Sequence, residues 1–329
     1  MAWDASSIAS ATPWAALSGK LQALVGGAGV ANWSFVEQIP AGIGAGCSGA
    51  AAYKVDVFKC AGAGTDANAA TTDWFFCLEI PVADGAVASN CMAFESYDPT
   101  TGQKKFKRPI AQYAVAPVGA GYWASDTYAP YASVQYSNRS TMVFTALNTY
   151  GFSYWIKLTN NGIQIAMRVS TTECSLGVHL LDSLTIVTDA VPLMSLGSTS
   201  VPAYHTLPGV TVAPSSYGWS ACLRPWISIV DTGWLSNVTN AQDLWLGGKL
   251  LLSRLVALHG AGAYGSPITK GLVRGLMKVD FMCFRPGGVV SLGDTLSFDG
   301  HADWTVITPG YTFGAGGFGT SMIIVTRAN

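Results

Sequence analysis

The sequence predicts a mainly β protein built from antiparallel, sandwich-like or barrel-like domains, with an amphipathic helix at the N-terminus and one further short helix. Three observations support this fold class. Short apolar or aromatic runs separated by Gly, Pro, Asn and Asp recur through most of the 329 residues, as is typical of strands joined by turns. One segment carries the Asn-Gly pair of a tight hairpin. Clear helical periodicity occurs near the N-terminus.

The predicted N-terminal helix begins after Thr12, which can serve as its N-cap. Pro13 takes the first helical position, where the missing N–H has no intrahelical partner to lose. Gly26 and Gly27 are expected to end the helix. The apolar residues at three- and four-residue spacing are Trp14, Leu17, Leu21 and Leu24.

Strands are predicted at 33–39, 53–60, 74–82 and 91–97, and in the C-terminal part at 289–292, 295–298, 304–307 and 322–326. The clearest hairpin runs from Ser153 to Ser170 through Asn160-Asn161-Gly162, because an Asn-Gly pair supplies the positive φ angles of a tight turn. Two further turns are expected at Gly293-Asp294 and Asp299-Gly300.

The second short helix is expected around residues 268–277, although its two glycines weaken the helical preference. The segment 189–216 is rich in Pro, Ser, Thr and Val and shows little alternation, which indicates a long loop or extended arm. We therefore expect an N-terminal β-rich domain with its leading helix at 1–190, a loop or arm at 191–215, and a C-terminal β-rich domain at 216–329.

The composition indicates burial between subunits. Half of the residues are hydrophobic and 11% are charged, against about 25% in ordinary globular domains. Eleven Trp, thirteen Tyr and thirteen Phe are too many for a disordered chain. The best candidate for a membrane-spanning helix is the segment 246–260. It is interrupted by charged residues and is shorter than the roughly 20 consecutive apolar residues that a spanning helix needs. Contacts between copies of the chain, which replace charged surface by apolar and aromatic surface, remain as the explanation.

Nucleic acid is not expected as a partner. The formal net charge is −1, and nucleic-acid binding depends on clustered Lys and Arg. One basic cluster, formed by Lys104, Lys105, Lys107 and Arg108, is interpreted as a solvated strand or loop.

Metal and redox chemistry have no sequence signature. The seven cysteines form no CxxC pair and lie mostly in apolar runs, where cysteine behaves as a small hydrophobe. They are Cys47, Cys60, Cys77, Cys91, Cys174, Cys222 and Cys283. None of the four histidines, His179, His205, His259 and His301, belongs to a paired metal-binding motif. His301, with Asp299 and Asp303 beside it, reads as part of a polar hairpin turn.

A dinucleotide site is not predicted either. The run from Gly260 through Gly262 to Gly265 matches GxGxxG and is followed by Asp280, but Pro267 stands where the helix would begin and too few residues remain for a βαβ unit. The same pattern recurs at Gly44 and at Gly314 in glycine-rich tracts. No GxSxG elbow occurs, and no carboxylate pair is distinguished for glycoside hydrolysis. We predict no catalytic, cofactor-binding or metal-binding residue, and the chain is not expected to be an enzyme.

Aromatic clusters are the most informative residues. They include Trp74-Phe75-Phe76, Tyr122-Trp123, Tyr154-Trp155, Trp219, Trp226, Trp234 and Trp245. Exposed rings of this kind can bind sugars, but core and interface packing uses them more often, because each ring buries a large area. Packing is therefore the interpretation we favour.

Three groups of segments form a recognisable pattern. The first is YWIKLTNNGI at 154–163 with Val169-Ser170 and Leu176-Gly177; the second is 293–296 with Asp299-Gly300, 304–306 and 323–327; the third is 73–76 with 93–98. Together they resemble segments of tailed-bacteriophage virion structural proteins. The resemblance implies a β-rich subunit of a ring in the tail or baseplate region, and it implies no catalytic residue.

The expected function is therefore structural: a tail or baseplate component of a virion assembled in the bacterial cytoplasm, acting through contacts with its own copies in a cyclic homo-oligomer and with other virion proteins. A capsid shell or decoration protein is one alternative. A carbohydrate-binding or host-receptor-binding module that uses exposed aromatic residues is another, and a hydrolase is the weakest.

Overall fold

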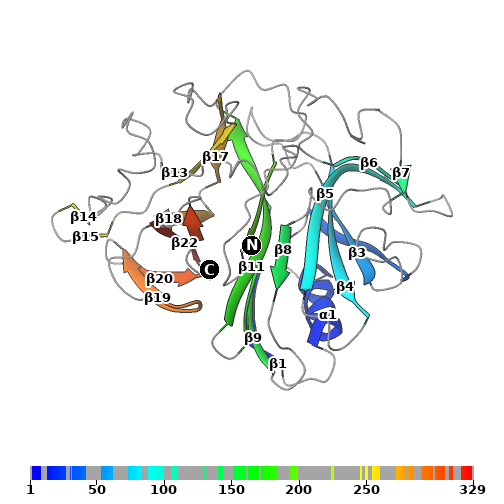
Figure 1. The fold of residues 1–329 in the computed structure, drawn as a ribbon, viewed down its shortest axis with the longest axis horizontal. Coiled ribbons are helices and arrows are strands. Elements are labelled where there is room, and N and C mark those ends of the chain that lie inside the picture. The colour runs from blue at the N-terminus through cyan, green and yellow to red at the C-terminus, as the bar shows by residue number, and fades with distance from the viewer. Residues whose placement is uncertain are drawn as a thin grey trace.

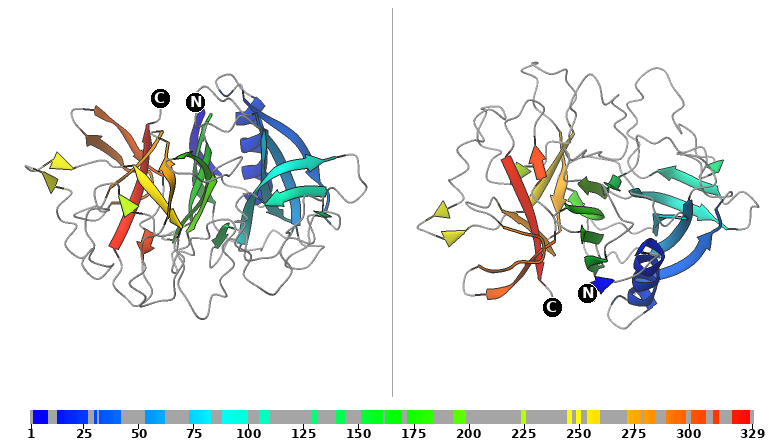
Figure 2. Two further views of the ribbon diagram at one scale, coloured as in Figure 1. Left: turned by 90° about the horizontal axis from the view of Figure 1, so that it is seen from above. Right: turned by 60° about the horizontal axis from the view of Figure 1, so that its bottom comes forward.

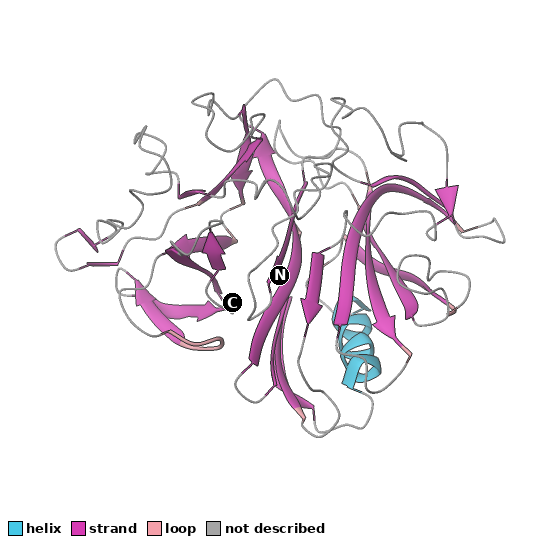
Figure 3. Cartoon of the chain, viewed as in Figure 1, coloured by secondary structure: helices cyan, strands magenta, loops and turns pink. Residues whose placement is uncertain are grey.

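Figure 1 shows the computed structural model of the chain, which has one α-helix and 22 β-strands among the residues it describes. The described residues are 2–8, 13–26, 30, 32–41, 53–61, 73–82, 88–99, 105–109, 129–130, 140–143, 151–160, 162–169, 172–183, 193–198, 224–225, 245–246, 249–250, 254–259, 272–278, 280–284, 290–298, 301–307, 311–313 and 320–327. Figure 3 shows how strongly strands dominate this part, which confirms the predicted mainly β class.

The N-terminal sheet has seven antiparallel strands in the order β2-β3-β4-β5-β6-β7, with β8 paired to β5. Its strands are β2 (Trp33–Ile39), β3 (Tyr53–Cys60), β4 (Trp74–Pro81), β5 (Ala88–Asp98), β6 (Lys105–Pro109), β7 (Ala129–Pro130) and β8 (Ser140–Val143). The predictions at 33–39 and 53–60 match β2 and β3 residue for residue, since each is a short run rich in aromatic and β-branched residues.

The central sheet has eight strands in the order β1-β9-β10-β11-β17-β16-β13, with β12 paired to β11. Its strands are β1 (Ala2–Ile8), β9 (Phe152–Thr159), β10 (Gly162–Val169), β11 (Thr172–Ser183), β12 (Leu193–Ser198), β13 (Arg224–Pro225), β16 (Leu255–His259) and β17 (Leu272–Met277).

The C-terminal sheet has five strands in the order β18-β22-β20-β19, with β21 paired to β22. Its strands are β18 (Phe281–Phe284), β19 (Thr295–Phe298), β20 (His301–Val306), β21 (Tyr311–Phe313) and β22 (Thr320–Arg327). A separate two-stranded ribbon joins β14 (Trp245–Leu246) to β15 (Lys249–Leu250).

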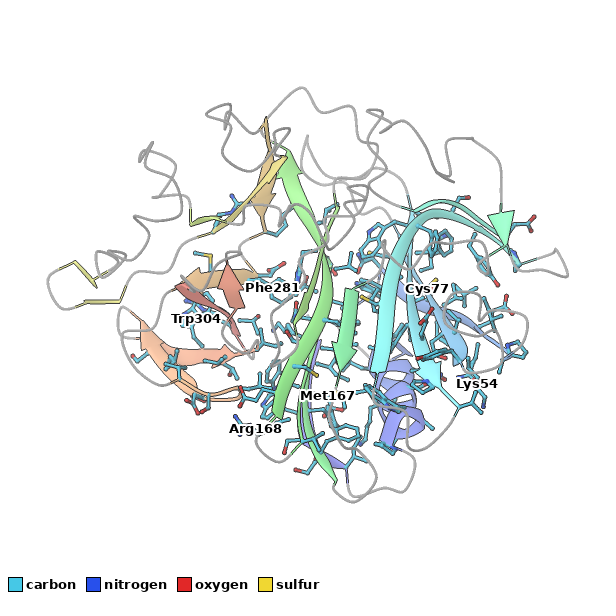
Figure 4. All side chains as sticks on the ribbon, in the orientation of Figure 1. Lys54, Cys77, Met167, Arg168, Phe281 and Trp304 are labelled. Carbon is cyan, nitrogen blue, oxygen red and sulfur yellow. The ribbon has the colours of Figure 1, made fainter. Side chains whose placement is uncertain are left out.

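The central sheet lies between the other two, as the view from above shows (Figure 2). Because side chains alternate along a strand, Met167 and Arg168 of β10 point to opposite sides of this sheet (Figure 4). Met167 belongs to the main hydrophobic core, which the central sheet shares with α1 and the N-terminal sheet. Arg168 points toward the C-terminal sheet, where its guanidinium donates to the carbonyl of Leu292.

Helix α1 (Pro13–Gly26) confirms the predicted N-terminal helix. Its apolar face packs into the main core, and Trp14, Leu17 and Leu21 are each at most 2% exposed. The fourth predicted member of that face, Leu24, is half-buried at its edge. No helix in the part of the chain that the structure describes is long and apolar enough to span a membrane.

The predicted hairpin is confirmed as β9 and β10, but its glycine has another role. Thr159 pairs with Gly162, so Gly162 is already the first residue of the second strand. A Cβ at Gly162 would lie 2.6 Å from the Val178 carbonyl oxygen in β11. Glycine is therefore required there for the close approach of the neighbouring strand.

A tight turn at 291–294, immediately before β19, packs the C-terminal sheet against the central sheet. The Asp294 N–H donates to the Ser291 carbonyl at 3.1 Å, and Gly293 has φ 87°. Glycine with positive φ at the third turn position is the pattern of a type II turn. Gly293 lies so close to the Trp155 ring of β9 that a Cβ would come within 2.4 Å of the ring.

Three predictions need correction. The helix expected around 268–277 is strand β17 from 272 to 277, because Gly275 and the β-branched Val273 disfavour a helix and both flanks find hydrogen-bonding partners in β11 and β16. The strand expected at 289–292 is not formed over 290–292, since Leu292 enters the tight turn. The arm expected at 191–215 contains strand β12 at 193–198, which pairs with β11.

The expected division into domains stays a prediction. Strands from both sides of the expected arm contribute to one sheet, since β11 pairs with β17. The turn expected at Asp299-Gly300 lies outside the described residues, while its flanks Phe298 and His301 pair with each other.

Candidate functional site

A pocket of about 470 Å³ lies beside α1, at the edge of the N-terminal sheet where β2 ends, β3 begins and β4 ends. Lys54 lies at this edge (Figure 4). The pocket is lined by apolar and polar side chains from all four elements. They are Pro13, Trp14, Ala15, Ser18, Gly19 and Gln22 of α1, with Gln38, Lys54, Ile80, Pro81 and Val82.

A carboxylate, Asp56 of β3, lies behind the polar part of this lining and is fully buried. The Ser18 hydroxyl donates to its Oδ2 at 2.5 Å, and Gln38 Nε2 donates to its Oδ1 at 2.8 Å. Gln22 Nε2 donates to the Ser18 hydroxyl at 3.0 Å and lies 3.4 Å from both carboxylate oxygens. Three side chains from two elements therefore satisfy this carboxylate, as buried charge requires.

A β-bulge in β2 creates this arrangement. The register between β2 and β3 shifts at Val36, so that Glu37 lies opposite Val57 and Gln38 lies opposite Asp56. Without the bulge, Val36 would pair with Val57 in a regular ladder, and side-chain alternation would place Glu37 beside Asp56, with two carboxylates facing each other. With it, Glu37 points to the other face of the sheet and accepts a hydrogen bond from the Tyr97 hydroxyl at 2.6 Å.

The pKa of Asp56 is set by opposing effects. Burial raises the pKa of its carboxyl, while the hydrogen bonds from Ser18, Gln38 and Gln22 and the charge of Lys54 act in the opposite direction. The Ser18 hydroxyl has a carboxylate as its partner and no imidazole, so it lacks the usual base of an activated serine. The arrangement holds α1 on the sheet and presents amide groups to the pocket.

A second buried polar layer lies between the central and C-terminal sheets. His179 is fully buried, donates a hydrogen bond from Nε2 to Gln164 Oε1 at 2.7 Å, and packs edge-on against Phe281 at 4.4 Å between ring centroids. Burial lowers the pKa of His179 to about 3, so the ring is neutral near pH 7. Its Nδ1 and the Gln164 amide nitrogen make no hydrogen bond in the described part of the chain.

Charged side chains complete this layer. Lys157 is fully buried and donates to the Arg327 carbonyl, and burial lowers its pKa. Arg168 Nε donates to Glu173 Oε1 at 2.7 Å, and Glu173 Oε1 accepts from the Leu292 N–H at 3.3 Å. Each charge is therefore matched to a backbone group or an opposite charge, and the layer fixes how the two sheets dock.

The sequence motifs weighed for nucleotide and metal chemistry do not come together in the described structure. The glycines of all three GxGxxG runs lie outside the described residues. The strands that flank the first run, β16 and β17, pair antiparallel, whereas a dinucleotide-binding unit needs parallel strands. His301 and Asp303 lie in β20 and His259 ends β16; Asp299 and His205 lie outside the described residues.

Within the described ranges, no group of three or more His, Cys, Asp and Glu side chains could hold a metal ion. Cys60, Cys77, Cys91 and Cys174 are free and buried. Burial raises the pKa of the Cys60 and Cys174 thiols, which disfavours the reactive thiolate. Cys283 lies in β18, while Cys47 and Cys222 lie outside the described residues.

The aromatic residues with described side chains serve packing. Trp14, Trp33, Trp74 and Trp304 are each at most 8% exposed, and Trp33 meets Trp74 edge-to-face at 5.1 Å. Exposed large hydrophobic side chains in the described part are limited to Val36 and Val82. This part of the surface therefore offers no broad apolar patch of the kind expected from the low charge. Tyr122, Trp123, Trp219, Trp226 and Trp234 lie outside the described residues.

The basic cluster is placed only by its backbone: Lys105, Lys107 and Arg108 lie in β6, and Lys104 lies outside the described residues. Comparison with models of protein families gives no match, and comparison with curated proteins gives none.

Proposed function

We propose that the chain is a structural component of a tailed-bacteriophage virion, in the tail or baseplate region, and that it acts by holding copies of itself and neighbouring virion proteins in register. No chemical step is assigned to it. Its role in this proposal is that of a stiff β scaffold whose sheets are locked together by the buried polar layer.

One observation carries the proposal: the segments that resemble phage virion proteins pack against each other in three dimensions. Trp155, in the first segment, contacts Gly293 in the second. Lys157 of the first donates to the Arg327 carbonyl at the end of the second. Within the third, 74–76 and 93–98 lie on the paired strands β4 and β5, and Asp73 directly precedes β4. If this chain shared a fold with phage virion proteins, the segments that resemble them would be expected to pack against each other, as these segments do.

Strand β1 is the surface that we assign to contact between copies. It is the edge strand of the central sheet and pairs with β9 over all seven of its residues without a bulge. Ala5, Ser6 and Ser7 are exposed. By contrast, the edge strand β2 carries the bulge at Val36, a feature that discourages further strand pairing. A regular, exposed edge can add a strand from a second copy.

Light scattering on a sizing column and electron microscopy of the full chain test this proposal. We expect a discrete ring or a filament. Ala5→Lys, which places a charge on the β1 edge, should shift the population toward smaller species, while the matched control Ser34→Lys on the edge strand β2 should assemble as the wild type does. A wild-type chain that stays monomeric at every concentration would argue against the proposal.

A further inference from the structure

The pocket beside α1 presents hydrogen-bond acceptors that the chain itself does not use. Gln22 and Gln38 both direct their amide nitrogens at Ser18 and Asp56. Since an amide oxygen diverges from its nitrogen, each Oε1 is left on the side away from the carboxylate, toward the pocket that both side chains line. In the described structure neither Oε1 takes part in a hydrogen bond.

The orientation of both amides is fixed by Asp56. A carboxylate only accepts hydrogen bonds, so neither Gln22 nor Gln38 can turn its oxygen inward without losing its bond and facing a negative charge. The pocket therefore keeps two acceptors at fixed places. A ligand must bring O–H or N–H donors to meet them.

The charges around the pocket select against ions. The buried Asp56 carboxylate and the two amide oxygens disfavour an anion. Lys54, which lines the pocket and forms no ion pair in the described part of the chain, disfavours a cation and can donate to a neutral oxygen. Most of the remaining lining is apolar, and Val82 is its exposed large side chain.

Gly19 supplies a second, independent observation. It lies in the middle of α1, where glycine is about 1 kcal/mol less favourable than alanine. No packing reason explains it, because a Cβ at this position would meet nothing within 4 Å. Gly19 lines the pocket, so the missing side chain keeps this wall open.

We propose that this pocket binds a neutral polyhydroxylated ligand, a single sugar unit, through the Oε1 atoms of Gln22 and Gln38, with Lys54 donating to a ligand oxygen. Adjacent hydroxyl groups both donate and accept hydrogen bonds, as the two amides and the ammonium require. The C–H face of the sugar ring lies against Val82, the exposed large apolar residue of the lining. This inference does not depend on the virion proposal, because it rests on the pocket alone.

Sugar binding to the full chain tests this proposal. We would titrate the chain with free glucose, galactose and N-acetylglucosamine, and follow binding by calorimetry and by saturation transfer from protein to sugar protons. Gly19→Leu fills the pocket from a position with room for a side chain. Ala23→Leu, one turn later and exposed outside the pocket, is the matched control. Gly19→Ala tests whether the fold tolerates a side chain there.

Saturable binding of at least one sugar is expected for the wild type and Ala23→Leu, and Gly19→Leu should bind it at least about tenfold more weakly. Three results would overturn the proposal: no saturable binding of any of the sugars, equal binding by Gly19→Leu, or stronger binding of acetate, ammonium or an uncharged blocked tripeptide. The last would assign the pocket to an ion or to a peptide segment.

Discussion

Replacing Gly293 by alanine should destabilise the fold through two separable effects. Gly293 has φ 87°, a conformation that costs an L-residue about 1–2 kcal/mol. The new Cβ would also lie 2.4 Å from Cζ2 of Trp155, and relieving such overpacking costs about 1–3 kcal/mol. Restricting the unfolded chain offsets about 0.4–1 kcal/mol of this loss. The net expected loss is about 1–4.5 kcal/mol.

Urea denaturation of the wild type, Gly293→Ala, Trp155→Ala and the double variant measures both effects. The steric part should disappear in the Trp155→Ala background, since the ring that the Cβ meets is gone, while the backbone part should persist. The double variant should therefore be less destabilised than the sum of the two single variants by about 1–3 kcal/mol. If Gly293→Ala lies within about 0.5 kcal/mol of the wild type, the turn does not dock against Trp155 as described.

Three further predictions follow from the buried polar groups and from the helix. Burial lowers the pKa of His179 to about 3 while the unfolded ring titrates near 6.5, so the unfolded state binds the extra proton between these values. The free energy of unfolding should fall by on the order of 5 kcal/mol as pH drops through this window, and His179→Gln should remove most of that dependence in acid titrations. Deleting Val36 should remove the bulge while leaving Phe35 opposite Phe58, Glu37 opposite Val57 and Gln38 opposite Asp56, so denaturation should show a loss of no more than about 1 kcal/mol; a loss of several kcal/mol would contradict the register. Gly19→Ala should raise the free energy of unfolding by about 1 kcal/mol, and a decrease would mean that its Cβ is not in open space.

Local pattern was enough to predict the elements whose signals lie within a few residues. Helix α1 and strands β2 and β3 follow from spacing, alternation and turn residues in the sequence. Strand β1 has no such signal, because its small and polar residues are poor strand formers. It is a strand because β9, some 150 residues later, pairs with it.

The sequence contains part of the information that defines the candidate site. Lys54 and Asp56 alternate onto one face of β3, and Ser18 and Gln22 stand four residues apart on one face of α1. The sequence does not show that this face of α1 packs against this face of β3, or that a bulge in β2 turns Gln38 toward both. Val36 reads as an ordinary strand residue, and the register shift becomes visible only once β2 and β3 are paired.

The most direct test of the central proposal is the location of the chain in a phage particle. Tailed particles purified from a lysate that expresses this protein should contain its peptides by mass spectrometry, and gold-labelled antibody against the chain should decorate one end of the tail. Labelling spread over the head would favour a capsid protein instead. Absence of the chain from purified particles would contradict the virion proposal outright.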